Sequence, residues 1–185
     1  MKSLRIFTLF LAVLFLSCDK EDEDTTPIDA QSLIGKWAVT SFIVDINIDG
    51  EIAEIPLNSS TKSVGENFDY ILTLTETTYT VEGSYDIVTT GKINGVPFDA
   101  DTQTIDRVSE TGTYSFSEDS ITFDGVLFEF DANDVEFSEF SEDQALKASF
   151  NTDGELVFIQ NVATDIAESP INTSVDSTIK LKRIE

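Results

Sequence analysis

Apolar residues alternate with polar ones through most of this sequence, and this period of two constrains the fold more than any other feature. Phe68, Tyr70, Leu72 and Leu74 would share one face of an extended strand. Side chains of a strand point alternately to its two faces, so this pattern indicates a strand with one buried face. The same alternation returns in residues 79–81, 114–116, 121–123, 156–160 and 179–183.

Turn-forming pairs separate these runs. Four pairs combine Asp or Asn with Gly: Asp49-Gly50, Asn94-Gly95, Asp124-Gly125 and Asp153-Gly154. Both residues of such a pair tolerate positive φ, which the tight turns of β-hairpins require. We therefore expect about nine or ten short antiparallel strands joined by tight turns.

Other segments complete the predicted secondary structure. Residues 28–34 are the best candidate for a short helix. Residues 135–150 are interpreted as two strands, although a helix would also fit them. Residues 86–112 look like a long hairpin with a loop at its open end, and the polar stretch 60–67 is expected to form a second loop. Binding residues often lie on such loops, so both are candidate contact points for a partner or a ligand.

An all-β chain of this kind folds as a sandwich or as an up-and-down barrel. The beginning of the first expected strand favours the barrel. Gly35-Lys36-Trp37 resembles the Gly-x-Trp opening of the lipocalins and related calycins. The resemblance implies a lipocalin-like, antiparallel up-and-down β-barrel of about eight strands over residues 32–185.

The resemblance also implies roles for three residues. In lipocalins the Trp of this motif plugs the closed end of the barrel, and a basic residue of the last strand packs across its ring. Gly35 and Trp37 would therefore lie at the closed end, with Arg183 in cation–π contact with Trp37. Lys182 would take that place if the strand presented its other face.

The only cysteine, Cys18, follows a segment typical of export signals. Lys2 and Arg5 precede an almost unbroken apolar run over residues 6–16, which is too short to span a bilayer. The pattern resembles a bacterial lipoprotein signal peptide. It implies that residues 1–17 are removed and that Cys18 carries the lipid that attaches the protein to a membrane. An ordinary secretory signal is the alternative.

Residues 18–31 are expected to form an acidic, disordered tether, because residues 19–27 offer almost no apolar surface to bury. Lys20-Glu21-Asp22 resembles the signal that sends lipoproteins to the outer face of the outer membrane in some Gram-negative lineages. Asp19 instead resembles the inner-membrane retention signal of enteric bacteria, and a plain acidic linker is a third interpretation. We expect a surface-exposed outer-membrane lipoprotein.

The charge of the chain excludes one class of partner. The chain carries 35 Asp and Glu against 11 Lys and Arg, a net charge of −24. Removal of residues 1–17 takes away Lys2 and Arg5 and no acid, so the mature chain would carry −26. Such a surface repels nucleic acid. A hydrophobic content of 41% nevertheless suits one domain with a sizeable core.

Residue types that most catalytic sites need are missing. The sequence has no histidine, and lipidation would consume Cys18, which excludes Ser-His and Cys-His nucleophiles and zinc-thiolate sites. Carboxylates remain, but the acid pairs at 118–119 and 142–143 are expected in solvated turns. Residues 131–136 offer oxygen ligands for a weak calcium site, without the spacing of an EF-hand. We expect no enzyme, no cofactor and no resident metal.

Binding is the function class that remains. The interior of an eight-stranded barrel can be filled by side chains or can hold one small ligand, and the sequence leaves both open. The residues expected to face inward are Phe68, Tyr70, Leu72, Tyr79, Tyr114, Phe116, Phe123, Phe150 and Phe158. The family resemblance implies a small apolar or amphipathic ligand, and we expect a monomer. The alternatives are a solid barrel that serves as an interaction module of a surface complex, and a glycan hydrolase built on two carboxylates.

Overall fold

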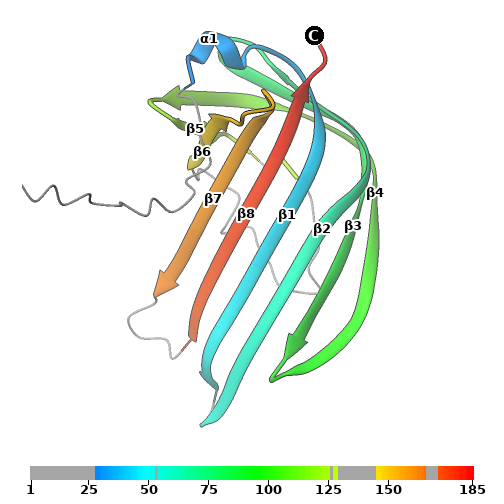
Figure 1. Cartoon of the computed structure of the whole chain (residues 1–185), viewed down its shortest axis with the longest axis vertical. Coiled ribbons are helices and arrows are strands. Elements are labelled where there is room, and N and C mark those ends of the chain that lie inside the picture. Colours follow the sequence, from blue (N-terminus) through cyan, green and yellow to red (C-terminus); the bar gives the residue numbers. More distant parts are fainter. Residues whose placement is uncertain (1–27, 53, 126, 129–144, 166–170) are drawn as a thin grey trace, which may run out of the picture.

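The computed structural model describes residues 28–52, 54–125, 127–128, 145–165 and 171–185, which form an almost all-β fold (Figure 1). One short helix precedes eight strands. Their bounds in chain order are α1 Ala30–Leu33, β1 Gly35–Ile52, β2 Ile55–Leu74, β3 Thr78–Ile93, β4 Val96–Ser117, β5 Ser120–Phe123, β6 Ala145–Phe150, β7 Leu156–Asp165 and β8 Ile171–Arg183.

The strands form a closed barrel. Each strand pairs antiparallel with the next along the chain, and β8 returns to pair with β1. In this last ladder Trp37 lies opposite Arg183 and Gly50 lies opposite Ile171. The predicted all-β class and the up-and-down order are confirmed, and the sandwich alternative is wrong. The described chain has eight strands, the number implied by the resemblance, and not the nine or ten short strands expected from the turn pattern.

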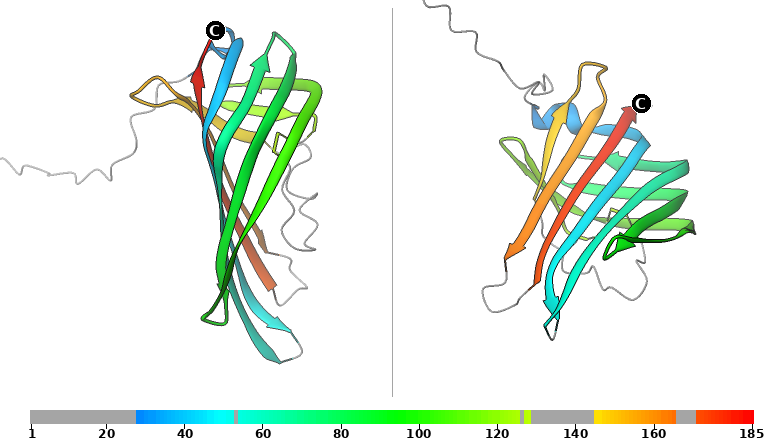
Figure 2. Two further views of the ribbon diagram at one scale, coloured as in Figure 1. Left: turned by 90° about the vertical axis from the view of Figure 1, so that its right-hand side faces the viewer. Right: turned by 60° about the horizontal axis from the view of Figure 1, so that its bottom comes forward.

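The strands differ greatly in length. β1 to β4 contain 18, 20, 16 and 22 residues, whereas β5 and β6 contain only 4 and 6. β5 pairs with β4 only through Tyr114, Ser115, Phe116 and Ser117. The hairpins β1–β2 and β3–β4 therefore extend well beyond β5 and β6, at the end of the barrel opposite α1 (Figure 2).

Two breaks expected from the sequence are continuous strand instead. Asp49-Gly50 is not a turn, because it lies within β1 and pairs with β2 on one side and with β8 on the other. Residues 60–67 are not a loop, because they lie within β2. The hydroxyls of Ser63 and Thr89 lie 2.9 Å apart and share a hydrogen bond, so this polar pair is satisfied between β2 and β3. Pairing on both edges holds these stretches extended against their local preferences.

The other local predictions agree with the described chain only in part. The short helix predicted at 28–34 is α1. The hairpin predicted at 86–112 is β3–β4, but a tight turn at Asn94-Gly95, with φ of 49° and 81°, takes the place of the expected loop. Within the ambiguous segment 135–150, residues 145–150 form β6, and residues 135–144 lie outside the described part of the chain.

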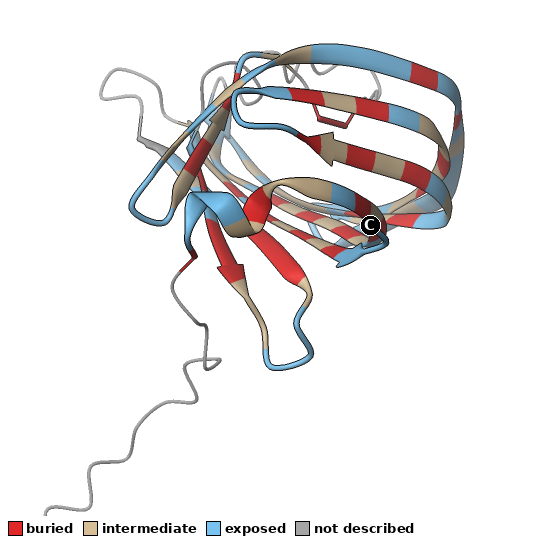
Figure 3. Cartoon of the chain, turned by 90° about the horizontal axis from the view of Figure 1, so that it is seen from above, coloured by how far each residue is buried: buried red, intermediate tan, exposed pale blue. Residues whose placement is uncertain are grey.

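Buried side chains alternate with more exposed ones along the strands and form one core inside the barrel (Figure 3). The helix α1 lies at one end of the barrel, next to the end of β8 (Figure 1). This end is called the closed end below. None of the described helices has the length and apolar character needed to cross a membrane.

Candidate ligand site in the barrel interior

Trp37 plugs the closed end from the first strand. Its side chain is fully buried, and its indole Nε1 donates a hydrogen bond of 2.8 Å to the carbonyl of Leu33 in α1. A buried indole must satisfy its N–H, and the end of a helix offers carbonyls without a partner inside the helix. Trp37 therefore fixes α1 onto the end of the barrel.

Arg183 completes the plug from the eighth strand. The central carbon of its guanidinium lies 4.2 Å from the centre of the Trp37 ring, which is the cation–π contact expected from the sequence. The same guanidinium donates to the carbonyl of Ile34 at 2.9 Å and to the carbonyl of Ser32. The neighbouring Lys182 is exposed. Arg183 thus joins β8, α1 and Trp37 in one contact.

Gly35 is required for this arrangement. Its φ is +146°, and a Cβ at this position would lie 2.6 Å from Arg183 Nη1 and 2.8 Å from the carbonyl oxygen of Glu185. A side chain would displace the guanidinium from the indole. All three residues of the resemblance therefore meet at the closed end.

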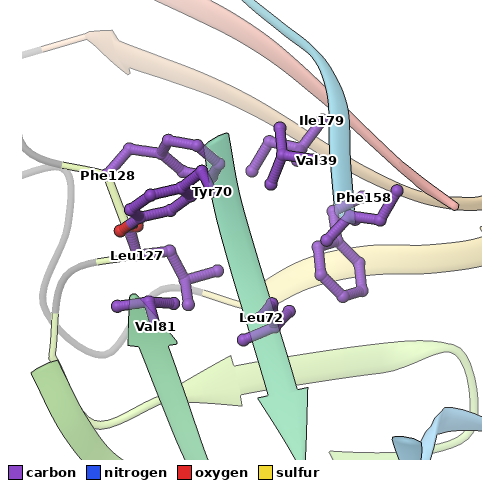
Figure 4. Close-up of a pocket in the computed structure, with 9 residues that line it drawn as sticks. Val39, Tyr70, Leu72, Val81, Leu127, Phe128, Phe158 and Ile179 are labelled. Atoms are coloured by element: carbon purple, nitrogen blue, oxygen red, sulfur yellow. The ribbon is translucent and has the colours of Figure 1, made fainter. Parts of the chain in front are cut away.

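A layer of apolar side chains lies next to Trp37, further into the barrel. A narrow gap in this layer is lined by Val39, Tyr70, Leu72, Val81, Leu127, Phe128, Phe158, Ile179 and Leu181 (Figure 4). Most of these residues belong to strands of the barrel wall. Leu127 and Phe128 come instead from the segment that follows β5, and both are buried. We call this pair the internal plug.

The internal plug fills the space between three strands. The ring of Phe128 stacks on Phe42 of β1 with 4.5 Å between centroids and 6° between planes. It also contacts Tyr70 of β2 at 5.3 Å and Tyr85 of β3 at 5.6 Å. The Tyr70 hydroxyl donates a 2.8 Å hydrogen bond to the carbonyl of Leu127. The barrel wall thus forms a receptor for one aromatic ring, and the chain itself supplies that ring.

The gap itself leaves no room for a ligand. Within the gap the volume open to the centre of a water molecule is ≈ 0 Å³. Among the described residues, no buried side-chain nitrogen or oxygen lacks a hydrogen-bond partner. A guest at this gap would therefore have to replace protein atoms.

The residues predicted to line the interior divide into two groups. Five are buried: Tyr70, Leu72, Tyr79, Phe123 and Phe158. Four are partly buried and pack against the same core: Phe68, Tyr114, Phe116 and Phe150. Of the nine, only Tyr70, Leu72 and Phe158 line the gap itself.

Sequence reasoning missed the internal plug. Leu127 and Phe128 belong to no strand and show no alternation, so the periodic signal that found the wall residues is absent there. The other missed lining residues are Val39, Val81, Ile179 and Leu181. They lie on predicted strands but are aliphatic, whereas the predicted lining was aromatic apart from Leu72.

A second group of rings lies around Phe123. Tyr79 meets Phe123 edge to face at 5.1 Å, and Tyr114 and Phe158 each lie 5.9 Å from it. The Tyr79 hydroxyl donates to the carbonyl of Asp124 at 3.2 Å. Burial raises the pKa of both the Tyr79 and the Tyr114 phenol, with nearby carboxylates adding to the effect. Both phenols are therefore held neutral.

The carboxylates of the described chain are not gathered into a site. The pair Glu118-Asp119 is exposed in the turn between β4 and β5. Groups of three or more potential metal ligands do not occur within the described ranges. The acid pair 142–143 and the candidate calcium ligands 131–136 lie outside these ranges, as does Cys18 with the signal and tether segments.

Comparison of this chain with protein-family models, with curated proteins and with solved structures gives no match.

Proposed function

We propose that this protein is a lipid-anchored lipoprotein of the cell envelope whose lipocalin-like barrel binds a small apolar or amphipathic ligand without catalysis. The single observation that carries the binding function is the internal plug. A short segment outside the barrel wall places one aromatic ring against Phe42, Tyr70 and Tyr85. An added ligand ring would meet the same surfaces.

The chemistry of the wall defines the class of ligand. The gap beside the internal plug is lined by aliphatic and aromatic side chains. Among the described lining residues, the only polar side-chain group is the Tyr70 hydroxyl. That hydroxyl now donates to the carbonyl of Leu127. A ligand with an apolar ring or branched chain and one hydrogen-bond acceptor would reproduce both contacts of the plug. A charged group would lose its hydration without a partner in the gap, so the ionised end of an amphipathic ligand would have to lie outside it.

Plug and ligand would compete for one space. Because the free volume is ≈ 0 Å³, ligand binding must include the free energy of expelling Phe128. Binding to the native chain is therefore expected to be weaker than the wall alone would allow. A smaller residue at position 128 removes this competition and should strengthen binding.

The test uses the chain with Cys18→Ser, which prevents lipidation, and two probes, the fluorescent fatty acid cis-parinaric acid and cholesterol. We expect Phe128→Ala to bind one of them at least about tenfold more tightly than the parent, since a competitor for the site is removed. Phe116→Ala, which removes a partly buried ring outside the gap, should leave the affinity unchanged. Phe128→Leu provides a milder variant in case the alanine variant does not fold.

The absence of binding by the parent and by both Phe128 variants, with all three shown to be folded by circular dichroism, would refute the proposed ligand site. If Phe128→Ala and Phe116→Ala raised the affinity for a probe equally, the competition between the internal plug and the ligand would be refuted.

A further inference from the structure

The open end of the barrel exposes apolar side chains at its hairpin turns. Ile55, Ile93 and Val96 are 67%, 50% and 69% exposed, whereas the large apolar side chains of the core are nearly all buried. Ile55 begins β2 next to the β1–β2 turn, and Ile93 and Val96 face each other across the β3–β4 turn. We call these three residues the tip patch. Both turns lie at the end opposite α1 (Figure 2).

The two hairpins are tied together close to their turns. The Asn94 backbone N–H donates to the carbonyl of Asn58 at 2.6 Å, and the Asn58 N–H donates to Asn94 Oδ1 at 2.8 Å. Asn94-Gly95 forms a turn with positive φ at both residues, which suits a tight hairpin. Ile93 and Val96 are therefore presented on an ordered turn, which lowers the entropy lost when a partner binds them.

Acidic residues lie on the same hairpin ends as the tip patch. Five exposed carboxylates lie on the same hairpin ends, against one exposed base, Lys92: Asp49, Glu51, Glu54, Asp99 and Asp101. Apolar side chains with polar groups beside them are the usual composition of a protein–protein contact. Because these side chains are acidic, the matching surface of a partner should carry basic residues.

This charge disfavours two other occupants. A second copy of the chain would bring one set of acidic residues against another, and anionic lipid headgroups would be repelled in the same way. The chain length adds a second argument against the membrane that holds the protein, and this argument rests on the proposed anchor at Cys18. Ile28 lies ten positions after Cys18, and this length of chain spans at most about 36 Å.

The barrel is longer than this reach. β1 runs for 18 residues from the closed end to the tip. At about 3.3 Å per residue and a tilt of about 40°, it extends roughly 45 Å along the barrel axis. The tips therefore cannot enter the anchoring membrane head-on while the closed end stays tethered to it.

We propose that the tip patch docks into an apolar recess with a basic rim on another protein, at the side of the barrel that faces away from the anchoring membrane. Ile93 and Val96 would enter the recess, and the carboxylates on the same hairpin ends would pair with its rim. This surface is separate from the internal plug, so it goes beyond the proposed ligand binding.

The test places a photoreactive benzoylphenylalanine at Val96 of the lipidated full chain in intact cells. Ile184 is the matched control, because it is 47% exposed and lies at the opposite end of the barrel. We expect one defined protein to crosslink from position 96 and not from position 184. The crosslinked peptide of that protein should contain apolar residues flanked by Lys or Arg.

Reconstitution with the purified partner then decides the proposal. Ile93→Ser with Val96→Ser should weaken binding at least about tenfold, whereas Ile184→Ser should not change it. Raising the salt from about 0.05 to 0.5 M should also weaken binding, because the charges beside the patch are screened. These variants leave Phe128 and the ligand assay untouched, so failure here is distinct from failure of the ligand proposal.

Three results would overturn the docking surface. The first is equal crosslinking from positions 96 and 184. The second is a product of twice the mass of the chain, which means a second copy. The third is crosslinking to lipid alone, which means a membrane surface.

Discussion

At the scale of single residues, Trp37 connects the helix to the barrel. It is fully buried, it contacts the ring of Phe150 at 5.9 Å, and its N–H is satisfied by Leu33. Truncation would leave a cavity at the closed end and a helix carbonyl without its donor. The indole is therefore a structural element of the fold and not a surface available to a ligand.

We expect Trp37→Ala to lower the free energy of unfolding by about 3–5 kcal/mol, because a large buried ring is lost. Denaturant melts of the variant and the parent would measure this difference. Ile184→Ala, at an exposed apolar position, should change stability by less than about 0.5 kcal/mol. A loss below about 1 kcal/mol for Trp37→Ala would mean that the indole does not support the closed end.

The guanidinium of Arg183 combines a charge with a planar fork, and its contacts use both properties. It lies over Trp37 and donates to two backbone carbonyls, those of Ile34 and Ser32. Lysine would keep the charge and lose the fork. We expect Arg183→Lys to destabilise by about 1–2 kcal/mol in thermal and denaturant melts. Lys182→Met, one residue earlier and exposed, should change the free energy of unfolding by less than about 0.5 kcal/mol. Equal effects of the two variants would contradict the role given to the guanidinium contacts of Arg183.

At the scale of the strands, the close approach of β2 and β3 depends on Gly83. Pairing of these strands is irregular between Glu66 and Asp69, and Gly83 has a φ of +128° opposite Tyr70. A Cβ at this position would lie 1.7 Å from the carbonyl oxygen of Asp69. The two strands could not keep their present separation around any larger residue.

Gly83→Ala should therefore lower the free energy of unfolding by at least about 3 kcal/mol or prevent folding. Backbone atoms, rather than a flexible side chain, would have to move. Gly154→Ala is the matched control. Gly154 also has a positive φ, +76°, but nothing lies within 4 Å of its added Cβ. The control should lose only about 1–2 kcal/mol, the cost of a left-handed conformation. Chemical denaturation would compare the stability of the two variants. A similar loss of stability in both would show that the positive φ, and not the close contact, sets the cost of the substitution.

Tyr79 makes the contact between β3 and the end of β5 sensitive to alkali. Burial first, then the charges of Asp124 and Glu110, raise the pKa of this phenol above its ordinary value of 10.0. The folded state thus favours the neutral form. Its contribution is complete below the unfolded pKa and is lost as pH rises through the raised folded pKa.

We expect stability to fall as the pH rises above about 10, and Tyr79→Phe to make this fall shallower. Urea melts at several pH values from about 9 to 11.5 would measure the slope. The slope that remains in the variant should come largely from Tyr114, whose pKa is also raised. An identical slope in parent and variant would mean that Tyr79 ionises as easily in the fold as outside it.

The strands also show where sequence reasoning succeeds. Alternation around Tyr70 and Phe158 located β2 and β7, since each of these strands has one face inside the barrel and one face in solvent. The closing contact of Trp37 and Arg183 followed from a family resemblance and not from periodicity. It is present because the β1–β8 register places the two residues opposite each other.

Where prediction failed, long-range contacts decide the local structure. Asp49-Gly50 favours a turn by itself, but strands on both sides supply its hydrogen bonds and keep it extended. The internal plug at Leu127 and Phe128 depends on a space that exists only after several strands have come together. No local pattern in the sequence reports such a space.

At the scale of the whole molecule, net charge acts against compactness. The chain carries −24, and the described residues form few ion pairs, among them Lys62–Asp45 at 3.0 Å. Asp45 also lies directly opposite Asp176 in the β1–β8 ladder. Like charges facing each other across strands are destabilising, and salt screens them.

We expect the melting temperature to rise by at least about 2 °C when sodium chloride is raised from about 0.05 to 0.5 M, because screening relieves this repulsion. Scanning calorimetry would record the shift. Asp176→Asn should reduce the shift, since it removes one of the facing charges. A melting temperature that is constant or falls with salt would show that the surface charges do not limit stability.

The pairing of β1 with β8 has a consequence for how the protein folds. It joins residues far apart in the chain, as in the hydrogen bond from Thr40 to Lys180, 140 positions away. Folding that depends on such distant pairing is slow, because much of the chain must be ordered before the contact forms. Until β8 is in place, one edge of β1 stays unpaired. A strongly negative chain is well suited to that interval, because mutual repulsion keeps unfinished barrels from joining edge to edge.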